Sequence, residues 1–141
     1  MVKILAVDDE LAIRELLYRF FSKKGYEVST ATDAEHALAL AGEKIFDLII
    51  TDMKMPGDSG ISFLKKIRAS QNKVPIVVYS GMITPEIETE ARQGGANEVL
   101  GKDVSMQILV ERIETILGAR SRSFDEGISK NSPRLLLVDD E

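Results

Sequence analysis

The sequence contains no cysteine, no tryptophan and a single histidine, His36. Without cysteine the 141 residues have no disulfide framework, no thiolate nucleophile and no cysteine-ligated zinc, and one histidine excludes most imidazole metal sites and histidine-based triads. No apolar run approaches the roughly 18 residues of a transmembrane helix, and the first residues lack the build of a signal peptide. Any chemistry must therefore rest on carboxylates, hydroxyls and lysines, and we expect a cytoplasmic protein with no membrane partner.

An excess of basic residues is also missing. The chain carries 23 acidic and 18 basic side chains, a net charge of −5, with 44% hydrophobic and 29% charged residues. This composition is ordinary for a globular domain, and the length suits one hydrophobic core with a short appendage. Nucleic-acid binding needs a clustered basic face, so we expect no nucleic-acid partner for this domain.

Short apolar runs alternate with helical patterns along residues 1–118. Five runs are typical of strands, at residues 3–7, 27–30, 46–51, 76–79 and 98–100, and each precedes a helical pattern. Strict alternation with short connections predicts a parallel α/β sheet with right-handed crossovers and helices on both faces. We predict a doubly wound, flavodoxin-like (βα)5 fold with strand order 2-1-3-4-5, complete by about Gly118.

Acidic side chains follow two strands that this order makes neighbours. Asp8 and Asp9 follow the first strand, and Asp52 follows the third, at the switch point of the sheet where ligands bind in such folds. Three carboxylates so close need a counter-charge, because like charges oppose one another's ionisation. Oxygen ligands without sulfur or imidazole favour Mg²⁺, which leaves coordination sites for phosphate oxygens.

Two further polar residues should face the same crevice. Ser80 ends the fourth strand and Lys102 follows the fifth, where they could bind oxygens of a phosphoryl group. Gly81, beside Ser80, leaves room for such a group. Asp52, at the centre of the set, is the natural nucleophile: a carboxylate that attacks phosphorus and forms an aspartyl phosphate.

The motifs at these strand ends resemble those of bacterial response-regulator receiver domains. The match covers residues 1 to about 118 and rests on Val7-Asp8-Asp9-Glu10, on Asp52-Met53-Lys54-Met55-Pro56-Gly57 through Gly60, on Ser80-Gly81 and on Lys102. The resemblance implies a switch in a two-component phosphorelay, in which Asp52 accepts a phosphoryl group from a sensor histidine kinase or a phosphotransfer protein. We therefore expect a signalling domain that catalyses its own phosphorylation and slow dephosphorylation, not a turnover enzyme.

The resemblance also implies a metal site. Asp9, Asp52 and the backbone carbonyl of Met53 would hold Mg²⁺, and Asp8 would act mainly through water. Asp8 and Asp9 could instead serve as ordinary charges at the N-terminus of the first helix, where acids complement the helix dipole. Their register with Asp52 favours the metal site.

The remaining roles concern the phosphoryl group and the output. Ser80 would hydrogen-bond one phosphoryl oxygen, Lys102 would pair with another, and Lys54 would overhang the site and tune hydrolysis. Asp103 stands where the family usually has a proline with a cis bond, and a cis bond without proline costs about 3–4 kcal/mol, so a trans bond is an alternative here. Val99 replaces the usual switch aromatic, so we expect the signal to travel through backbone shifts of the loops after strands 4 and 5.

The last residues suggest a longer protein. Residues 134–141 repeat residues 3–10, with five of eight positions identical. We divide the chain into a receiver domain (1–118), a linker (119–133) and the truncated first strand of a second receiver (134–141), with a second receiver or an effector domain downstream. Chance similarity is the alternative.

Two other functions stay open. A Mg²⁺-dependent phosphohydrolase would also use an aspartyl nucleophile, but such enzymes carry a second aspartate two positions later, where this chain has Lys54. A degenerate receiver would act as a phosphorylation-independent docking module, which the departures at Val99 and Asp103 suggest.

Overall fold

The computed structural model describes residues 1–55, 58–70 and 72–129. The chain divides into two compact units, residues 1–105 and a second unit that begins at Met106. The repeated run at residues 134–141 lies outside the described residues, so the division into receiver, linker and second receiver stays a prediction. No helix among the described residues is long and apolar enough to cross a membrane.

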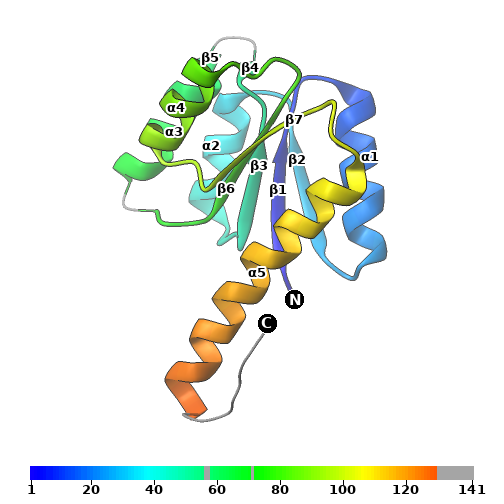
Figure 1. Ribbon diagram of the computed structural model, residues 1–141, viewed down its shortest axis with the longest axis vertical. Coiled ribbons are helices and arrows are strands. Elements are labelled where there is room, and N and C mark those ends of the chain that lie inside the picture. The colour runs from blue at the N-terminus through cyan, green and yellow to red at the C-terminus, as the bar shows by residue number, and fades with distance from the viewer. Residues whose placement is uncertain (56–57, 71, 130–141) are drawn as a thin grey trace. The chain divides into compact units, whose positions relative to one another are not determined.

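The first unit is built on a five-stranded parallel sheet (Figure 1). Its strands are β1 (Lys3–Val7), β2 (Glu27–Ala31), β3 (Leu48–Thr51), β6 (Ile76–Ser80) and β7 (Glu98–Gly101). They lie in the order β2-β1-β3-β6-β7, which confirms the predicted order 2-1-3-4-5. Val7 pairs with Ala31 on one side and with Thr51 on the other, so the carboxyl ends of the three strands are in register.

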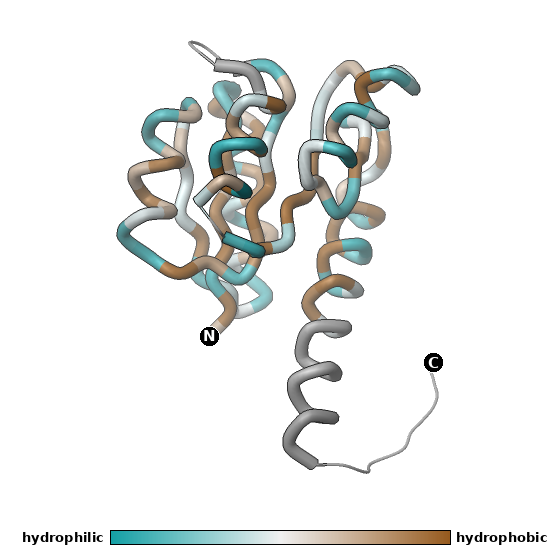
Figure 2. Tube along the Cα trace, turned by 90° about the vertical axis from the view of Figure 1, so that its left-hand side faces the viewer, coloured by the Kyte–Doolittle hydropathy of each residue, from teal (hydrophilic) through white to brown (hydrophobic). Residues whose placement is uncertain are grey.

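Four helices connect these strands: α1 (Leu11–Lys23), α2 (Ala34–Glu43), α3 (Gly60–Ala69) and α4 (Pro85–Gly94). Figure 1 shows α1 on the opposite side of the sheet from α2, α3 and α4. Alternate strand residues such as Leu5 and Ile49 pack in one core cluster with Ala37, Phe63 and Ala91 from those three helices. Hydrophobic residues accordingly run along the strands in Figure 2, as a parallel sheet covered on both faces requires.

The helix ends follow local sequence signals. Asp33 and Thr84 are the N-caps of α2 and α4, and each accepts a hydrogen bond from the backbone N–H three residues later, at 2.8 and 3.1 Å. Pro85 is the first residue of α4, where its missing N–H leaves no bond unmade. Gly25 and Gly95 follow α1 and α4 with φ of 89° and 118°, a conformation that glycine adopts at low cost.

The loop after β3 contains structure that the sequence did not indicate. The punctuation between Asp52 and Gly60 is typical of an irregular loop, yet β4 (Lys54–Met55) and β5 (Asp58–Ser59) pair there as antiparallel strands. Two strands of two residues are too short to leave a period-two pattern in the sequence. This small hairpin turns the chain back beside the end of β3.

Helix α5 (Met106–Ser129) begins the second unit. Its expected end near Gly118 is wrong, because the helix continues to Ser129, through the first part of the predicted linker. The apolar stripe lapses after Gly118, but the stretch between there and Pro133 contains no proline. It begins with alanine and arginine, which are good helix formers. The lapse in periodicity therefore marked the end of the apolar face and not the end of the helix.

Candidate functional site

The carboxyl ends of β1, β3, β6 and β7 meet at one edge of the sheet and carry polar side chains. Asp8 directly follows β1, Asp52 follows β3, Ser80 is the last residue of β6, and Lys102 follows β7. Backbone hydrogen bonds fix this register: the N–H of Asp52 donates to the carbonyl of Val7 at 3.2 Å, and that of Lys102 to the carbonyl of Ser80 at 2.7 Å. The fold therefore brings four of the predicted site residues together.

The ammonium group of Lys102 lies among three carboxylates. Its Nζ is 2.9 Å from Oδ2 of Asp8, 2.6 Å from Oε1 of Glu10 and 3.0 Å from Oδ2 of Asp52. Each of these acids offers an oxygen within 4.8 Å of the others, a spacing at which ionised carboxylates repel strongly. Lys102 is thus the counter-charge that the acidic residues require.

Burial differs sharply across this cluster. The side chains of Asp8 and Asp52 are 3% and 8% exposed, whereas that of Glu10 is 59% exposed. Burial lowers the pKa of Lys102, but its hydrogen bonds to Glu10, Asp8 and Asp52 outweigh burial and hold that pKa above its usual value. Burial raises the pKa of Asp8, and the hydrogen bond from Lys102 offsets only part of the rise. The lysine is therefore charged at neutral pH.

The two oxygens of Asp52 have different surroundings. Oδ1 accepts a hydrogen bond from the N–H of Met53 at 2.6 Å and a longer one from the N–H of Lys54 at 3.4 Å. Oδ2 contacts the Lys102 ammonium. The backbone therefore orients the carboxylate, and Oδ2 is the oxygen next to the positive charge of Lys102.

Gly60, the first residue of α3, lies close to the backbone of Asp52 and Met53. The N–H of Gly60 donates to the carbonyl of Met53 at 2.8 Å. A Cβ atom at position 60 would collide with the carbonyl oxygen of Asp52 and lie 2.7 Å from Cα of Met53, and main-chain atoms cannot turn aside as a side chain can. Only glycine fits here, because the start of α3 packs against the main chain of Asp52 and Met53.

A cleft of about 490 Å³ opens above the cluster. Six of the residues that line it were predicted from the sequence to belong to the site: Asp9, Asp52, Lys54, Ser80, Gly81 and Lys102. Glu10 and Met82 also line it and were not predicted. Ser80 is only 2% exposed, and its hydroxyl has no hydrogen-bond partner among the described residues. Space next to Gly81 is open, since an added Cβ would meet nothing within 4 Å.

The sequence analysis gave Glu10 no role, but the structure brings its carboxylate close to those of Asp8 and Asp52. Asp9 is exposed and lines the cleft, but the acid that joins Asp8 and Asp52 is Glu10. Glu10 has extended backbone, with φ −88° and ψ 117°. Side chains two residues apart on extended chain share a side, so the alternation along Asp8-Asp9-Glu10 was the signal that could have identified Glu10.

The two departures from the expected motifs are also visible. Val99 is 7% exposed and pairs with Val78 in the sheet, so an aliphatic side chain fills the position of the switch aromatic. No cis peptide bond occurs among the described residues, so the bond between Lys102 and Asp103 is trans. Lys102 reaches the acidic cluster with this trans bond, and its aim at Asp52 does not depend on proline.

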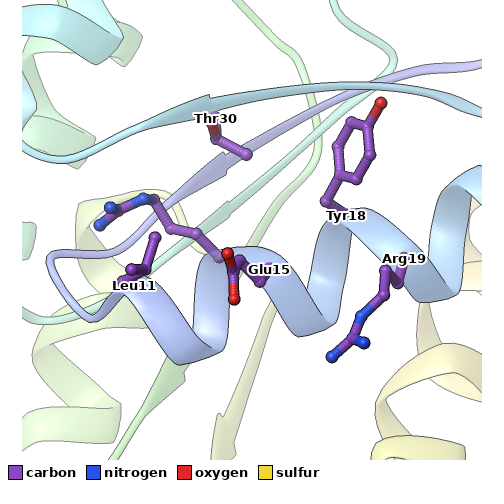
Figure 3. Close-up of a pocket in the computed structure, with 6 residues that line it drawn as sticks. Leu11, Glu15, Tyr18, Arg19 and Thr30 are labelled. Atoms are coloured by element: carbon purple, nitrogen blue, oxygen red, sulfur yellow. The ribbon is translucent and has the colours of Figure 1, made fainter.

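A second hollow, of about 350 Å³, lies between α1 and β2 (Figure 3). It contains a single carboxylate, that of Glu15, and so lacks the cluster of acidic groups found in the cleft at the strand ends. The residues that line it are Leu11, Arg14, Glu15, Tyr18, Arg19 and Thr30. Nη1 of Arg14 donates to the carbonyl of Asp8 at 2.8 Å. Arg14 therefore links this hollow to the main chain of Asp8 at the site, but the hollow itself offers no cluster of carboxylates.

Comparisons with known proteins agree with this geometry. The family model of the response regulator receiver domain matches residues 4–114. Among curated proteins, the response regulator MprA of Mycobacterium sp. (strain KMS) is 33% identical over 138 residues, which are 98% of this chain and 58% of that protein. The chain thus spans little more than half the length of this relative.

Solved structures give the same result. The chemotaxis protein CheY4 of Vibrio cholerae is 37% identical, with a TM-score of 0.77 over 82% of this chain and 98% of that one. The response regulator protein TrrA of Thermotoga maritima, solved in complex with Mg²⁺ and beryllofluoride, is 32% identical, with a TM-score of 0.74 over 82% and 99% of the two chains. This chain belongs to the family of response regulator receiver domains.

Proposed function

We propose that this domain is a phosphorylation-dependent switch in which Asp52 accepts a phosphoryl group from a histidine kinase or a phosphotransfer protein. The observation that carries the proposal is the setting of Asp52, whose Oδ1 is held by the N–H of Met53 while Oδ2 contacts the ammonium of Lys102. An oriented, buried carboxylate beside a fixed positive charge is suited to attack on a phosphoryl group, because both positioning and charge are already arranged.

In the transfer, an oxygen of Asp52 bonds to phosphorus while the bond from phosphorus to the donor's imidazole nitrogen breaks, and the nitrogen leaves with the electron pair. The donor groups for the phosphoryl oxygens are the Lys102 ammonium and the Ser80 hydroxyl. Ser80 supports this role because its buried hydroxyl is unpaired among the described residues. Gly81 leaves the open space beside it that a phosphoryl group needs.

The acidic cluster fits Mg²⁺. Its ligands are carboxylate oxygens alone, and the Lys102 ammonium marks the point among them where positive charge is favoured. Asp8, Asp9 and Asp52 would hold the ion, which when bound would neutralise charge on the phosphoryl oxygens. The structure of the similar protein TrrA with Mg²⁺ and beryllofluoride supports this assignment.

A main-chain carbonyl would complete the ligand set. The prediction names Met53, whose carbonyl accepts a hydrogen bond from Gly60. Successive carbonyls of an extended strand point to opposite sides, so the carbonyl of Lys54 points away from Gly60. It lies on the same side of the strand as the Lys54 N–H, which approaches Asp52. The Lys54 carbonyl is therefore the alternative ligand.

The competing functions have less support. A phosphohydrolase would need an acid two positions after the nucleophile, and that position holds Lys54, an exposed residue lining the cleft. A degenerate docking module would be expected to have lost part of the cluster, but Asp8, Asp52 and Lys102 are in contact. We therefore infer that the domain acts through a phosphorylated state that lasts long enough to signal.

The partners belong to the same proposal. A sensor histidine kinase or phosphotransfer protein would deliver the phosphoryl group, and a second receiver or an effector domain would follow in the full-length protein. The support is the family, the repeated run at residues 134–141, and the greater length of MprA. The cytoplasmic location expected from the sequence stays a prediction.

Beryllofluoride with Mg²⁺ mimics the phosphoryl group and tests the proposal by fluorine NMR. We expect one bound species per chain, absent from Asp52→Asn and retained in Asp33→Asn, a matched control in which asparagine can still cap α2. Consumption of acetyl phosphate should stop near one equivalent at early times. Many rapid turnovers would support the hydrolase, and no adduct in the folded wild-type protein would support the docking module.

A further inference from the structure

Glu10 stands at the N-cap position of α1, but its side chain makes no capping hydrogen bond, and the first turn of α1 contains no acid. Its carboxylate instead contacts Lys102, 92 residues away in the sequence, at 2.6 Å. This is the shortest of the three contacts made by the ammonium. The N–H of Glu10 also donates to Oδ1 of Asp8 at 2.9 Å, which fixes the backbone from which the side chain reaches.

We propose that Glu10 is a positioning residue for Lys102: it holds the ammonium over Asp8 and Asp52 in the resting state, and so restrains Lys102 from making way for the metal and from turning to the phosphoryl group. This inference rests on the proposed function and adds a regulatory residue to it.

The ammonium has three donors, and three carboxylates use them. A metal ion that binds Oδ2 of Asp8 and Oδ2 of Asp52 competes with the ammonium for the same oxygens. A phosphoryl oxygen must likewise take a donor from one of the three acids. Asp8 and Asp52 are committed to the metal and to the chemistry, so Glu10 is the partner that belongs to the resting state alone.

The exposure of Glu10 suits this role. Its side chain is 59% exposed, so water can solvate the Glu10 carboxylate when its contact with Lys102 breaks, and no buried charge is left unpaired. Release of the ammonium by Asp8 or Asp52 would leave a carboxylate that is less than a tenth exposed. Glu10 therefore provides a contact that is easily broken, and its strength sets how readily Lys102 moves.

Glu10 could act in another way, as a ligand that itself binds Mg²⁺, because its oxygen lies within 4.8 Å of those of Asp8 and Asp52. The two roles predict opposite signs. Loss of a ligand weakens metal binding whether or not Lys102 is present. Loss of a residue that holds the ammonium strengthens metal binding, and only while the ammonium is there.

A double-mutant cycle separates them. Mg²⁺ affinity is measured by calorimetry for wild type, Glu10→Gln, Lys102→Met and the double variant, with Glu15→Gln, an exposed acid on the same helix, as the control for net charge. We expect Glu10→Gln to tighten Mg²⁺ binding about two- to fivefold, the range for an exposed ion pair, and to change it less than about twofold in the Lys102→Met background.

A further variant and a metal-free readout extend the test. Glu10→Asp keeps the charge but is one methylene shorter, and we expect it to behave as Glu10→Gln does if reach is what matters. Nitrogen-detected NMR of the Lys102 ammonium in metal-free buffer should show a restrained signal in wild type that exchanges faster in both Glu10 variants. Because Glu10 is exposed, neither substitution threatens the fold.

Weaker Mg²⁺ binding in Glu10→Gln by the same factor in both backgrounds would overturn the proposal and identify Glu10 as a ligand. Unchanged binding in both backgrounds would overturn it as well. If wild type forms the beryllofluoride adduct but the Glu10 variants follow either of these patterns, the inference fails and the proposed function stands. If folded wild type binds neither Mg²⁺ nor beryllofluoride, the proposed function itself fails.

Discussion

The ammonium of Lys102 lies 3.0 Å from Oδ2 of Asp52, across 50 residues of sequence. This contact offsets the charge of a carboxylate that is less than a tenth exposed. In the phosphorylated state that we propose, the same lysine would pair with an oxygen of the new group. One residue therefore stabilises the acidic site in both states, and the structure predicts what happens when it is removed.

Lys102→Met should destabilise the metal-free protein. Asp8 and Asp52 would lose their shared positive neighbour and repel each other, so we expect the free energy of unfolding to fall by about 1–3 kcal/mol in urea denaturation. Mg²⁺ should recover part of that loss, because it supplies the missing charge. Lys54→Met, at an exposed position in the same cleft, should change stability by less than about 0.5 kcal/mol. A loss in Lys102→Met that Mg²⁺ leaves unchanged would show that the carboxylates are not its cause.

Asp8→Asn should stabilise the metal-free protein at neutral pH. Burial raises the pKa of Asp8 above its usual 3.8, so its ionisation opposes folding, and this loss of stability appears as the pH rises through the folded-state pKa. Asparagine removes the loss, and we expect a gain in the free energy of unfolding near pH 7 that disappears near pH 3, where aspartate is protonated in both states. Urea denaturation at both pH values measures it. An equal gain at both would mean that ionisation of Asp8 is not the cause.

Gly60→Ala should damage both the fold and the site. The new methyl group would collide with main-chain atoms of Asp52 and Met53, and we expect a loss of about 1–3 kcal/mol together with weaker beryllofluoride binding. Gly42→Ala is the matched control, because a Cβ there meets nothing within 4 Å. In the helix α2 it should stabilise the protein by about 0.5–1 kcal/mol and leave the adduct unchanged. Similar behaviour of the two variants would contradict the close approach at Gly60.

Ser80→Ala should separate stability from phosphoryl binding. The Ser80 hydroxyl is buried and unpaired among the described residues, so its removal should change the free energy of unfolding by less than about 0.5 kcal/mol or raise it slightly. The loss of one donor to the phosphoryl mimic should weaken the beryllofluoride adduct about tenfold in fluorine NMR titrations. Unaltered adduct affinity would remove Ser80 from the phosphoryl-binding groups.

Much of the fold could be predicted because the strands are buried on both faces and stand out as apolar runs between helical patterns. Asp8, Asp52, Ser80 and Lys102 could be placed together for the same reason, since parallel strands end at one edge of the sheet. The β4–β5 hairpin and the end of α5 could not, because neither depends on a buried stripe. Two-residue strands carry no period, and residues after Gly118 continue a helix without an apolar face.

Glu10 shows a different limit of sequence reasoning. Its contact with Lys102 depends on the direction of an extended backbone at the exit of β1 and on the reach of a lysine 92 residues later. Composition and hydrophobic period report burial, but they do not report which of three consecutive acids turn toward a distant ammonium. The alternation of side chains along extended chain is the one local rule that favours Glu10 over Asp9.

The most direct test of the central claim is phosphorylation of the intact protein by acetyl phosphate in the presence of Mg²⁺, followed by intact-mass measurement and by mapping of the modified residue after borohydride trapping. We expect one phosphoryl group per chain, on Asp52, that requires Mg²⁺ and is absent from Asp52→Asn. Modification of another residue, or a folded wild-type protein that remains unmodified, would contradict it.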